Sequence, residues 1–228
     1  MAISKEVESQ FSHHHISKQF EHELVDIRNR VLILGGLVEE QIELAVRSLV
    51  DNDLELAERV VQDDRKVNAM EVSIDEECTQ ILALRQPTAR DLRLVVAVIK
   101  TITDLERIGD EAKRIARFTI EMAELFPKRN QFTDLQQLAD SARMLLRESL
   151  DAFARIDPEE SLRVARSDAK VDSEYESIMR QQITYMMEDP RSIPVSLNIM
   201  WAARALERVG DRACNICEYV IYYAMGKN

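Results

Sequence analysis

Residues 105–115 read LERIGDEAKRI, and residues 206–216 repeat the pattern as LERVGDRACNI. Side chains four residues apart lie on one face of an α-helix, so Glu106 is expected beside Asp110, and Glu207 beside Asp211. Two carboxylates at this spacing repel each other unless a cation lies between them. A glycine precedes each aspartate, although glycine inside a helix costs about 1 kcal/mol relative to alanine. We infer that the rest of the chain is built to present these two acidic faces.

The composition favours an all-α protein. Hydrophobic residues make up 46% of the 228 residues, which is enough for a core, whereas there are only five Gly, five Pro and 5% aromatic residues. An all-β fold would need more turns and more β-forming residues. The formal net charge of −11 argues against binding to nucleic acid and against direct attachment to anionic lipids.

The chain also has no sequence that predicts a membrane span. The best apolar run, VLILGGLV at 31–38, is far shorter than the ~18–20 residues that a membrane helix needs. The N-terminus lacks the apolar segment of a signal peptide. Three cysteines, an odd number within helical patterns, suit a reducing compartment. We therefore expect a cytoplasmic protein.

Apolar residues at three- and four-residue steps predict six long helices. Their approximate ranges are 17–50, 54–85, 88–126, 133–157, 158–189 and 192–224. Asp53 and Asp157 are expected to cap the helices that follow them, and Thr88 and Thr133 to open capping boxes. Residues 1–16, which include three adjacent histidines at 13–15, are expected to form a flexible tail, with adventitious metal binding as the minor alternative.

The two halves of the chain are an internal duplication. Residues 34–67 align with 138–171 without a gap, and the acidic motifs align at an offset of 101 residues. Long antiparallel helices with short connections pack as bundles. The sequence therefore predicts two tandem, pseudo-symmetric three-helix bundles, residues 1–126 and 127–228, with 127–132 as the linker.

Acidic residues also stand at positions of the second and fifth helices that should be apolar. The apolar face of the second helix runs through Val60, Asp64, Val67, Glu71, Ile74, Cys78 and Ile81. The equivalent positions of the fifth are Val164, Asp168, Val171, Tyr175 and Ile178, with Asp172 beside them. Because a lone buried carboxylate is costly, Asp64 and Asp168 either pair with cations such as Arg107 and Arg208 or converge with the acids of the following helix. The alternative is that they lie at the solvated rim.

The acids form two oxygen-rich sets that suit iron, manganese, magnesium or calcium. The candidate metal ligands are Glu106, Asp110 and Asp64 in the first half, and Glu207, Asp211, Asp168 and Asp172 in the second. The Glu-x-x-His element of di-iron bundles is absent from them. Cys214 and Cys217 have the spacing of a redox or zinc pair, but without a second pair we interpret them as structural. No phosphate loop and no Ser/His/Asp arrangement points to an enzyme.

Together with VNAME at 67–71, RQPTARDLR at 85–93, KVDSEYE at 170–176 and YMMED at 185–189, the duplicated motifs resemble the PhoU family over about residues 15–226. The resemblance implies two symmetric three-helix bundles. It also implies multinuclear iron or zinc clusters, in at least some members, on the faces that carry Glu106, Asp110, Glu207 and Asp211. The repeats differ, because Tyr175 stands opposite Glu71 and Cys214 opposite Lys113.

The resemblance further implies a negative regulator of the phosphate-starvation response that is not an enzyme. Such an adaptor couples the ATPase subunit of the phosphate ABC transporter to the sensor histidine kinase PhoR and limits phosphate uptake. We expect a homodimer that reaches the membrane only through these partners. Two alternatives come from the residues: a carboxylate-bridged metal bundle with an enzymatic or metal-storage role, and acidic faces that bind partners without metal.

Overall fold

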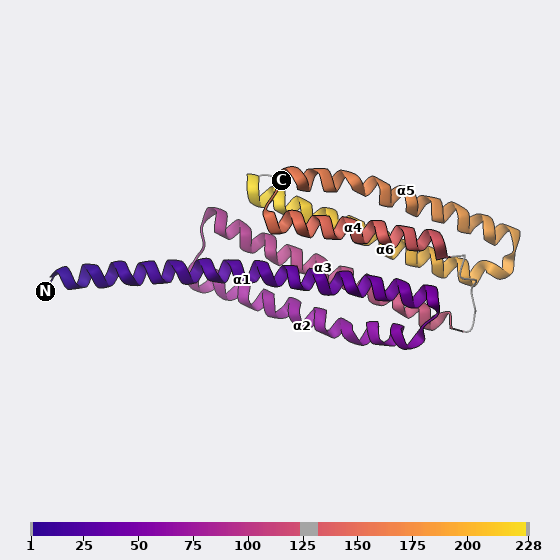
Figure 1. The fold of residues 1–228 in the computed structure, drawn as a ribbon, viewed down its shortest axis with the longest axis horizontal. Coiled ribbons are helices and arrows are strands. Elements are labelled where there is room, and N and C mark those ends of the chain that lie inside the picture. The colour runs from indigo at the N-terminus through magenta and orange to yellow at the C-terminus, as the bar shows by residue number, and fades with distance from the viewer. Residues whose placement is uncertain (1, 124–131, 227–228) are drawn as a thin grey trace.

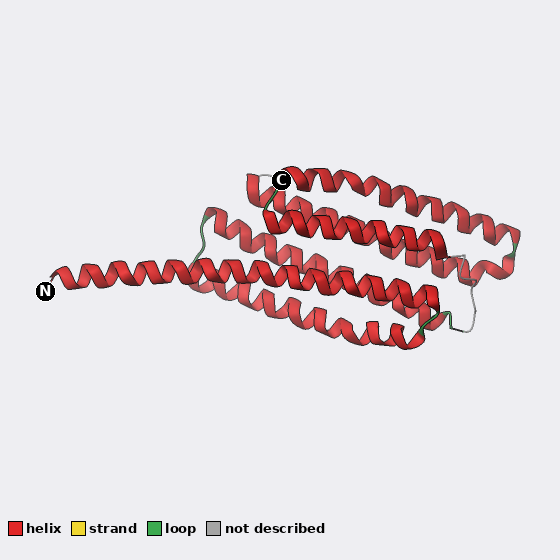
Figure 2. Cartoon of the chain, viewed as in Figure 1, coloured by secondary structure: helices red, strands yellow, loops and turns green. Residues whose placement is uncertain are grey.

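The computed structural model describes the backbone of residues 2–123 and 132–226, with side chains from residue 18 onward, and over these ranges it is all-α (Figures 1 and 2). The first half holds three long helices, α1 (Ala2–Asp51), α2 (Leu54–Arg85) and α3 (Ala89–Glu121). The second half holds α4 (Thr133–Arg155), α5 (Pro158–Glu188), a short 3₁₀ turn η2 (Pro190–Ser192) and α6 (Ile193–Met225). The predicted fold class is confirmed.

The helices pack as two three-helix bundles that lie side by side. Helices α1, α2 and α3 contact one another, and α4 and α5 each pack against the other and against α6 (Figure 1). The bundles meet where α1 packs against α4 and α3 packs against α6, so α2 and α5 lie on the outside. Within the described ranges, no helix is long and apolar enough to cross a membrane.

Two of the predicted helix caps are confirmed. The Asp53 carboxylate accepts a hydrogen bond from the backbone N–H of Leu56 at 2.9 Å. Asp157 accepts two, from the N–H groups of Glu159 and Glu160 at 3.1 and 3.0 Å, and Pro158 occupies the first turn. These side chains satisfy backbone donors that a helix start leaves free.

Thr88 occupies the N-cap position of α3 as predicted, but its side chain makes no capping hydrogen bond. Other predicted helix ends are wrong. Thr133 lies inside α4, where Phe132 is the N-cap residue. Helix α3 ends at Glu121 rather than near residue 126. Helix α1 begins at Ala2 rather than near residue 17, and the side chains of the three histidines lie outside the described ones. Most of the predicted linker also lies outside the described ranges, so the domain boundary stays a prediction.

The contact between α3 and α6 contains two buried carboxylates that are paired with arginines. Asp104, 3% exposed, accepts hydrogen bonds from Arg212 Nη1 at 3.1 Å and from the Tyr219 hydroxyl at 2.8 Å. Glu111, 4% exposed, accepts from Arg208 Nη1 at 3.2 Å. Buried ions need such partners to offset their desolvation, so these pairs define how the two bundles fit together.

Candidate functional site

The acidic site of the first repeat lies between α2 and α3 and contains its own cation. Asp64, 2% exposed, projects from α2 toward the α3 face that carries the motif. Lys113 Nζ donates to Asp64 Oδ2 at 2.7 Å and lies 3.6 Å from Asp110 Oδ1. Gln41 Nε2 donates to the other oxygen of Asp64 at 3.3 Å. The lysine therefore neutralises the buried aspartate and reaches the motif aspartate from the same helix.

Burial and the neighbouring acids both affect the ionisation of Glu106. Burial, and after it the neighbouring charges of Asp110, Glu71 and Asp64, raises the pKa of Glu106 above its ordinary value. The hydrogen bond from Lys113 to Asp64 raises the pKa of that lysine, which keeps it protonated. Glu106 therefore lies in an acidic field that the lysine partly compensates.

The acidic site of the second repeat, between α5 and α6, has no lysine at the equivalent position. Cys214 stands there, half-buried, and its Sγ donates to the backbone carbonyl of Ala165 at 3.7 Å. Burial, and then the Asp168 carboxylate, raises the pKa of the Cys214 thiol. A protonated thiol carries no charge, so nothing at this position neutralises Asp168.

Two buried carboxylate oxygens in this second site have no hydrogen-bond partner among the described residues: Asp168 Oδ1 and Glu207 Oε2. Arg204 forms an ion pair with the other oxygen of Glu207. Burial is the first cause that raises the pKa of Asp168, and Asp172 and Asp211 add to it. Burial and Asp211 likewise raise the pKa of Glu207. Unpartnered buried oxygens of this kind are rare in native proteins and call for an explanation.

The structure explains the glycine in each motif. A Cβ atom on Gly210 would lie 2.7 Å from Asp168 Oδ1, which is closer than non-bonded atoms approach. A Cβ atom on Gly109 would lie 3.1 Å from Gln41 Oε1 and 3.3 Å from Val67 Cγ1. The glycines therefore let the motif helix approach the acidic helix, and this contact compensates their cost inside a helix.

The PhoU domain model matches the chain twice, over residues 31–119 and 135–220. The chain belongs to the PhoU family. The phosphate-specific transport system accessory protein PhoU of Escherichia coli (strain K12) is 49% identical over 216 residues, or 94% of this chain and 88% of that protein. The PhoU homologue of Pseudomonas aeruginosa is 49% identical over 213 residues, or 93% and 88%.

Two solved structures have the same fold. The crystal structure of PhoU from P. aeruginosa superposes with a TM-score of 0.87 at 48% identity and covers 91% of this chain and 100% of that one. The structure of the phosphate transport system regulatory protein PhoU from Streptococcus pneumoniae gives 0.84 at 30% identity, covering 91% and 98%. The PhoU family consists of accessory and regulatory proteins of phosphate transport, so the prediction that this chain is not an enzyme is confirmed.

The metal clusters implied by the PhoU resemblance fit the two sites unequally. Among the described residues, no group of three or more Asp, Glu, Cys or His side chains is arranged to hold a metal ion. In the first site, Lys113 lies between Asp64 and Asp110, where a cation would be needed, so the residues do not fit a metal beside it. In the second site, the unpartnered oxygens of Asp168 and Glu207 are hard donors that no described group binds, although Arg204 pairs with the other oxygen of Glu207.

Sequence reasoning identified the acids of this PhoU chain but missed their partners. Asp64 pairs with Lys113 rather than with Arg107, and Arg208 bonds to Glu111 across the bundle contact rather than to Asp168. The signal for Lys113 was present, because it follows Asp110 by three residues and shares its helix face. Trp201 is 50% exposed, and its ring centroid lies 5.9 Å from that of Phe118.

The cysteine pair remains structural in this interpretation. Cys217 is completely buried, and burial raises its pKa to about 12. Both Cys214 and Cys217 are free thiols. A thiol with so high a pKa is a poor nucleophile and a poor metal ligand near neutral pH, because both roles need the thiolate.

Proposed function

We propose that this chain restrains the phosphate-starvation response. It would couple the phosphate ABC transporter, through the ATPase subunit, to the sensor histidine kinase PhoR, and would limit phosphate uptake. The observation that carries the proposal is the match to PhoU proteins over both repeats, including 94% of the chain against the E. coli phosphate-specific transport system accessory protein.

The architecture supports an adaptor with two separate binding faces. Among the described residues, helix α2 makes its main contacts with α1 and α3, and helix α5 makes its main contacts with α4, η2 and α6. Each bundle therefore offers an outer helix that the other bundle does not cover (Figure 1). An adaptor that holds a transporter and a kinase together needs two such faces. We propose a cytoplasmic location and a homodimer on the same family grounds.

Deletion of the gene tests this function. Phosphate-responsive genes should be expressed in phosphate-rich medium when the chain is missing, and phosphate uptake should rise. Both effects should be reversed by the wild-type gene on a plasmid. Unchanged expression and uptake in the deletion strain would overturn the proposal.

We also propose that the second repeat binds a cation of the iron or zinc type and that Lys113 replaces that cation in the first repeat. The ligands would be Glu207, Asp211, Asp168 and Asp172. In the first repeat, Lys113 would keep Asp64 and Asp110 paired, and Glu106 beside them would bind no metal. The supporting observation is the pair of unpartnered buried oxygens in the second site. Asp211 and Asp172 are exposed, so their side chains are free to rotate toward a cation. A bound cation would neutralise the acidic face and join α5 to α6.

Elemental analysis of protein purified without a metal-affinity step tests the metal proposal. The parent should contain metal, and the folded Glu207→Gln/Asp211→Asn variant should lose it. The matched Glu106→Gln/Asp110→Asn variant should retain the parental amount. Equal loss in both variants would mean that both repeats bind metal, and an empty parent would leave the acidic faces as docking or solvated surfaces. No observation favours the enzymatic or storage alternative.

A further inference from the structure

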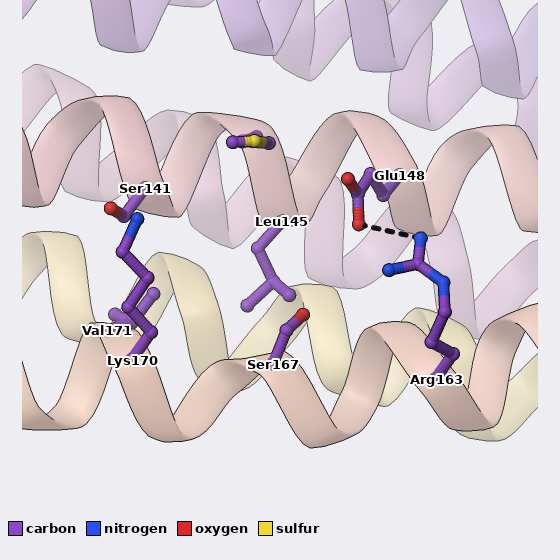
Figure 3. Close-up of a pocket in the computed structure, with 8 residues that line it drawn as sticks. Ser141, Leu145, Glu148, Arg163, Ser167, Lys170 and Val171 are labelled. Atoms are coloured by element: carbon purple, nitrogen blue, oxygen red, sulfur yellow. Dashed lines mark hydrogen bonds and ion pairs between the residues drawn. The ribbon is translucent and has the colours of Figure 1, made fainter.

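A groove runs between α4 and α5 on the outer side of the second bundle (Figure 3). Its volume is about 130 Å³, and its floor is formed by the buried side chains of Leu145 and Val171. Lys170 and Ser141 stand at one end in Figure 3, and Arg163 and Glu148 at the other. The lining residues are Ser141, Met144, Leu145, Glu148, Arg163, Ser167, Lys170 and Val171.

The first bundle has the corresponding groove between α1 and α2, with a volume of about 120 Å³. It lies at the same positions of the internal duplication, since residues 34–67 align with 138–171. Arg59 corresponds to Arg163, and Lys66 corresponds to Lys170. Two grooves of the same origin and size therefore exist in one chain, which makes each the natural control for the other.

The grooves differ in the acid that faces the shared lysine. In the first groove, Asp63 lies 2.7 Å from Lys66 Nζ and 3.6 Å from Arg59 Nε, so it neutralises both cations. The second groove has Ser167 at the position of Asp63, and its hydroxyl donates to the Val164 carbonyl of its own helix at 2.6 Å. A second acid of the first groove, Glu40, is likewise replaced in the second.

Lys170 is consequently less neutralised than its counterpart. Its ion-pair partner is Glu174, at 3.8 Å and on the same helix, which is a long distance for a direct hydrogen bond. At the far end of the groove, Arg163 is held by Glu148 at 3.2 Å and by Glu160 at 2.6 Å. The end that holds Lys170 is therefore the less neutralised end of the groove. Met144, the counterpart of Glu40, is 52% exposed at the rim.

We propose that the α4–α5 groove is a docking site for a segment of a partner protein that inserts one aliphatic side chain of leucine size and places a carboxylate beside Lys170. A cavity of ~150 Å³ lined by apolar side chains holds a benzene ring, so the groove is large enough for such a side chain. Met144 supplies a wall that adapts to the shape of the inserted group. The charge of Lys170 is complementary to the carboxylate.

The same segment is rejected by the first groove. Asp63 and Glu40 would face the incoming carboxylate there, and repulsion of this kind is a common source of binding specificity. The docking site rests on the proposed adaptor function. It specifies where a partner binds, in the groove between α4 and α5.

Reciprocal exchange of the distinguishing residue tests the docking site. The purified transporter complex with its ATPase subunit and the detergent-solubilised kinase are immobilised in turn, and the full chain is titrated onto each by biolayer interferometry. Ser167→Asp should weaken binding to one of them by about tenfold, because it places a carboxylate next to Lys170. The matched variant Asp63→Ser should bind within about twofold of the wild type, because that groove is not used. Both exchanges insert residues that the other repeat already carries at that position.

Any other result contradicts a specific part of the proposal. If the wild type binds a partner and Ser167→Asp binds equally well, the docking site is wrong and the adaptor function stands. If Asp63→Ser weakens binding as much as Ser167→Asp, the segment does not discriminate between the grooves. If the wild type binds neither partner, the adaptor function fails and the docking site fails with it.

Inorganic phosphate is titrated alone as a further probe, and binding that Ser167→Asp abolishes would assign the groove to a small anion instead. Circular dichroism confirms that the variants are folded.

Discussion

The two acidic sites are built from equivalent helices of the two repeats and carry the same motif, but they balance charge differently. In the first repeat Lys113 bonds to the buried Asp64, whereas in the second Cys214 leaves Asp168 without a cation. A single position of the motif helix therefore decides whether the buried acid is neutralised within the protein. The repeat that lacks the lysine is the one for which we propose a bound cation.

The two copies of the motif also differ at a second position, and there the difference joins the two bundles. The residue after the motif aspartate is Glu111 in the first copy and Arg212 in the second, and both turn toward the contact between the bundles. Glu111 bonds to Arg208 of the second copy, and Arg212 bonds to Asp104 beside the first. Divergence at this position made the two copies complementary, which favours pairing of one bundle with the other over pairing with its own kind.

The largest expected effect in this comparison is that of Lys113→Met. The substitution leaves the Asp64 carboxylate buried and unpaired, which should lower the free energy of unfolding by about 3 kcal/mol in urea denaturation. The double variant Lys113→Met/Asp64→Asn should recover most of the loss, because it removes the unpaired charge. Equal stabilities for the single and double variants would contradict the assignment of Lys113 as the internal cation.

A smaller loss is expected when the contact between the bundles is broken at Asp104. Asp104→Ala should cost about 2 kcal/mol, because Arg212 and the Tyr219 hydroxyl both lose a charged acceptor. A double-mutant cycle with Arg212→Ala measures the pair by urea denaturation. Additive losses from the two single variants would mean that this ion pair does not hold the bundles together.

Cys214→Lys should make the second site resemble the first. The new ammonium group would neutralise Asp168, so the variant should be more stable than the parent by about 1 kcal/mol in the absence of metal. It should also contain no metal by elemental analysis, because the lysine takes the position of the cation. Cys214→Met is the control of similar size without charge. Metal content that is unchanged in Cys214→Lys would contradict the equivalence of lysine and cation.

The smallest expected effect is a pH-dependent stabilisation of the first groove that the second groove lacks. Lys66 donates to Asp63 and lowers the pKa of that carboxylate below its unfolded value of about 3.9. The stabilisation is therefore present above about pH 4 and is lost as the pH falls through the lower folded-state pKa. Asp63→Ser should cost at most about 0.5 kcal/mol near neutral pH, because the pair is solvent-screened, and nothing under strongly acidic conditions.

Thermal denaturation across this pH range measures the difference. Ser167→Ala, which changes the equivalent residue of the second repeat without altering charge, is the control and should show no pH-dependent difference from the parent. A cost of Asp63→Ser that persists at low pH would assign the effect to packing rather than to the ion pair.

Helix positions and the duplication were predictable because both can be read from the order of residues along the chain. Neither depends on which helices pack together. The apolar periodicity of α2, for example, places Val60, Val67 and Ile74 on one buried face whatever the neighbouring helices are. The caps at Asp53 and Asp157 were equally local, since each side chain reaches a backbone N–H two or three residues later. Thr88 does occupy the N-cap position of α3, but the side-chain hydrogen bonds expected from Thr88 and Thr133 are absent, because a capping motif alone does not determine the side-chain geometry at a helix start.

The sequence by itself determined the number and order of the helices, the two-repeat organisation and the acids that share a helix face. Only the tertiary structure decided which charges meet. Arg107 and Lys113 were both within reach of Asp64 by sequence, but the rotation of α3 against α2 turns Lys113 toward Asp64 and leaves Arg107 exposed. In the second repeat, the packing of α6 against α5 brings Gly210 against Asp168. Sequence spacing specifies positions around one helix, whereas a partner depends on how two helices are rotated and how far apart they lie, and these come from packing of the whole core.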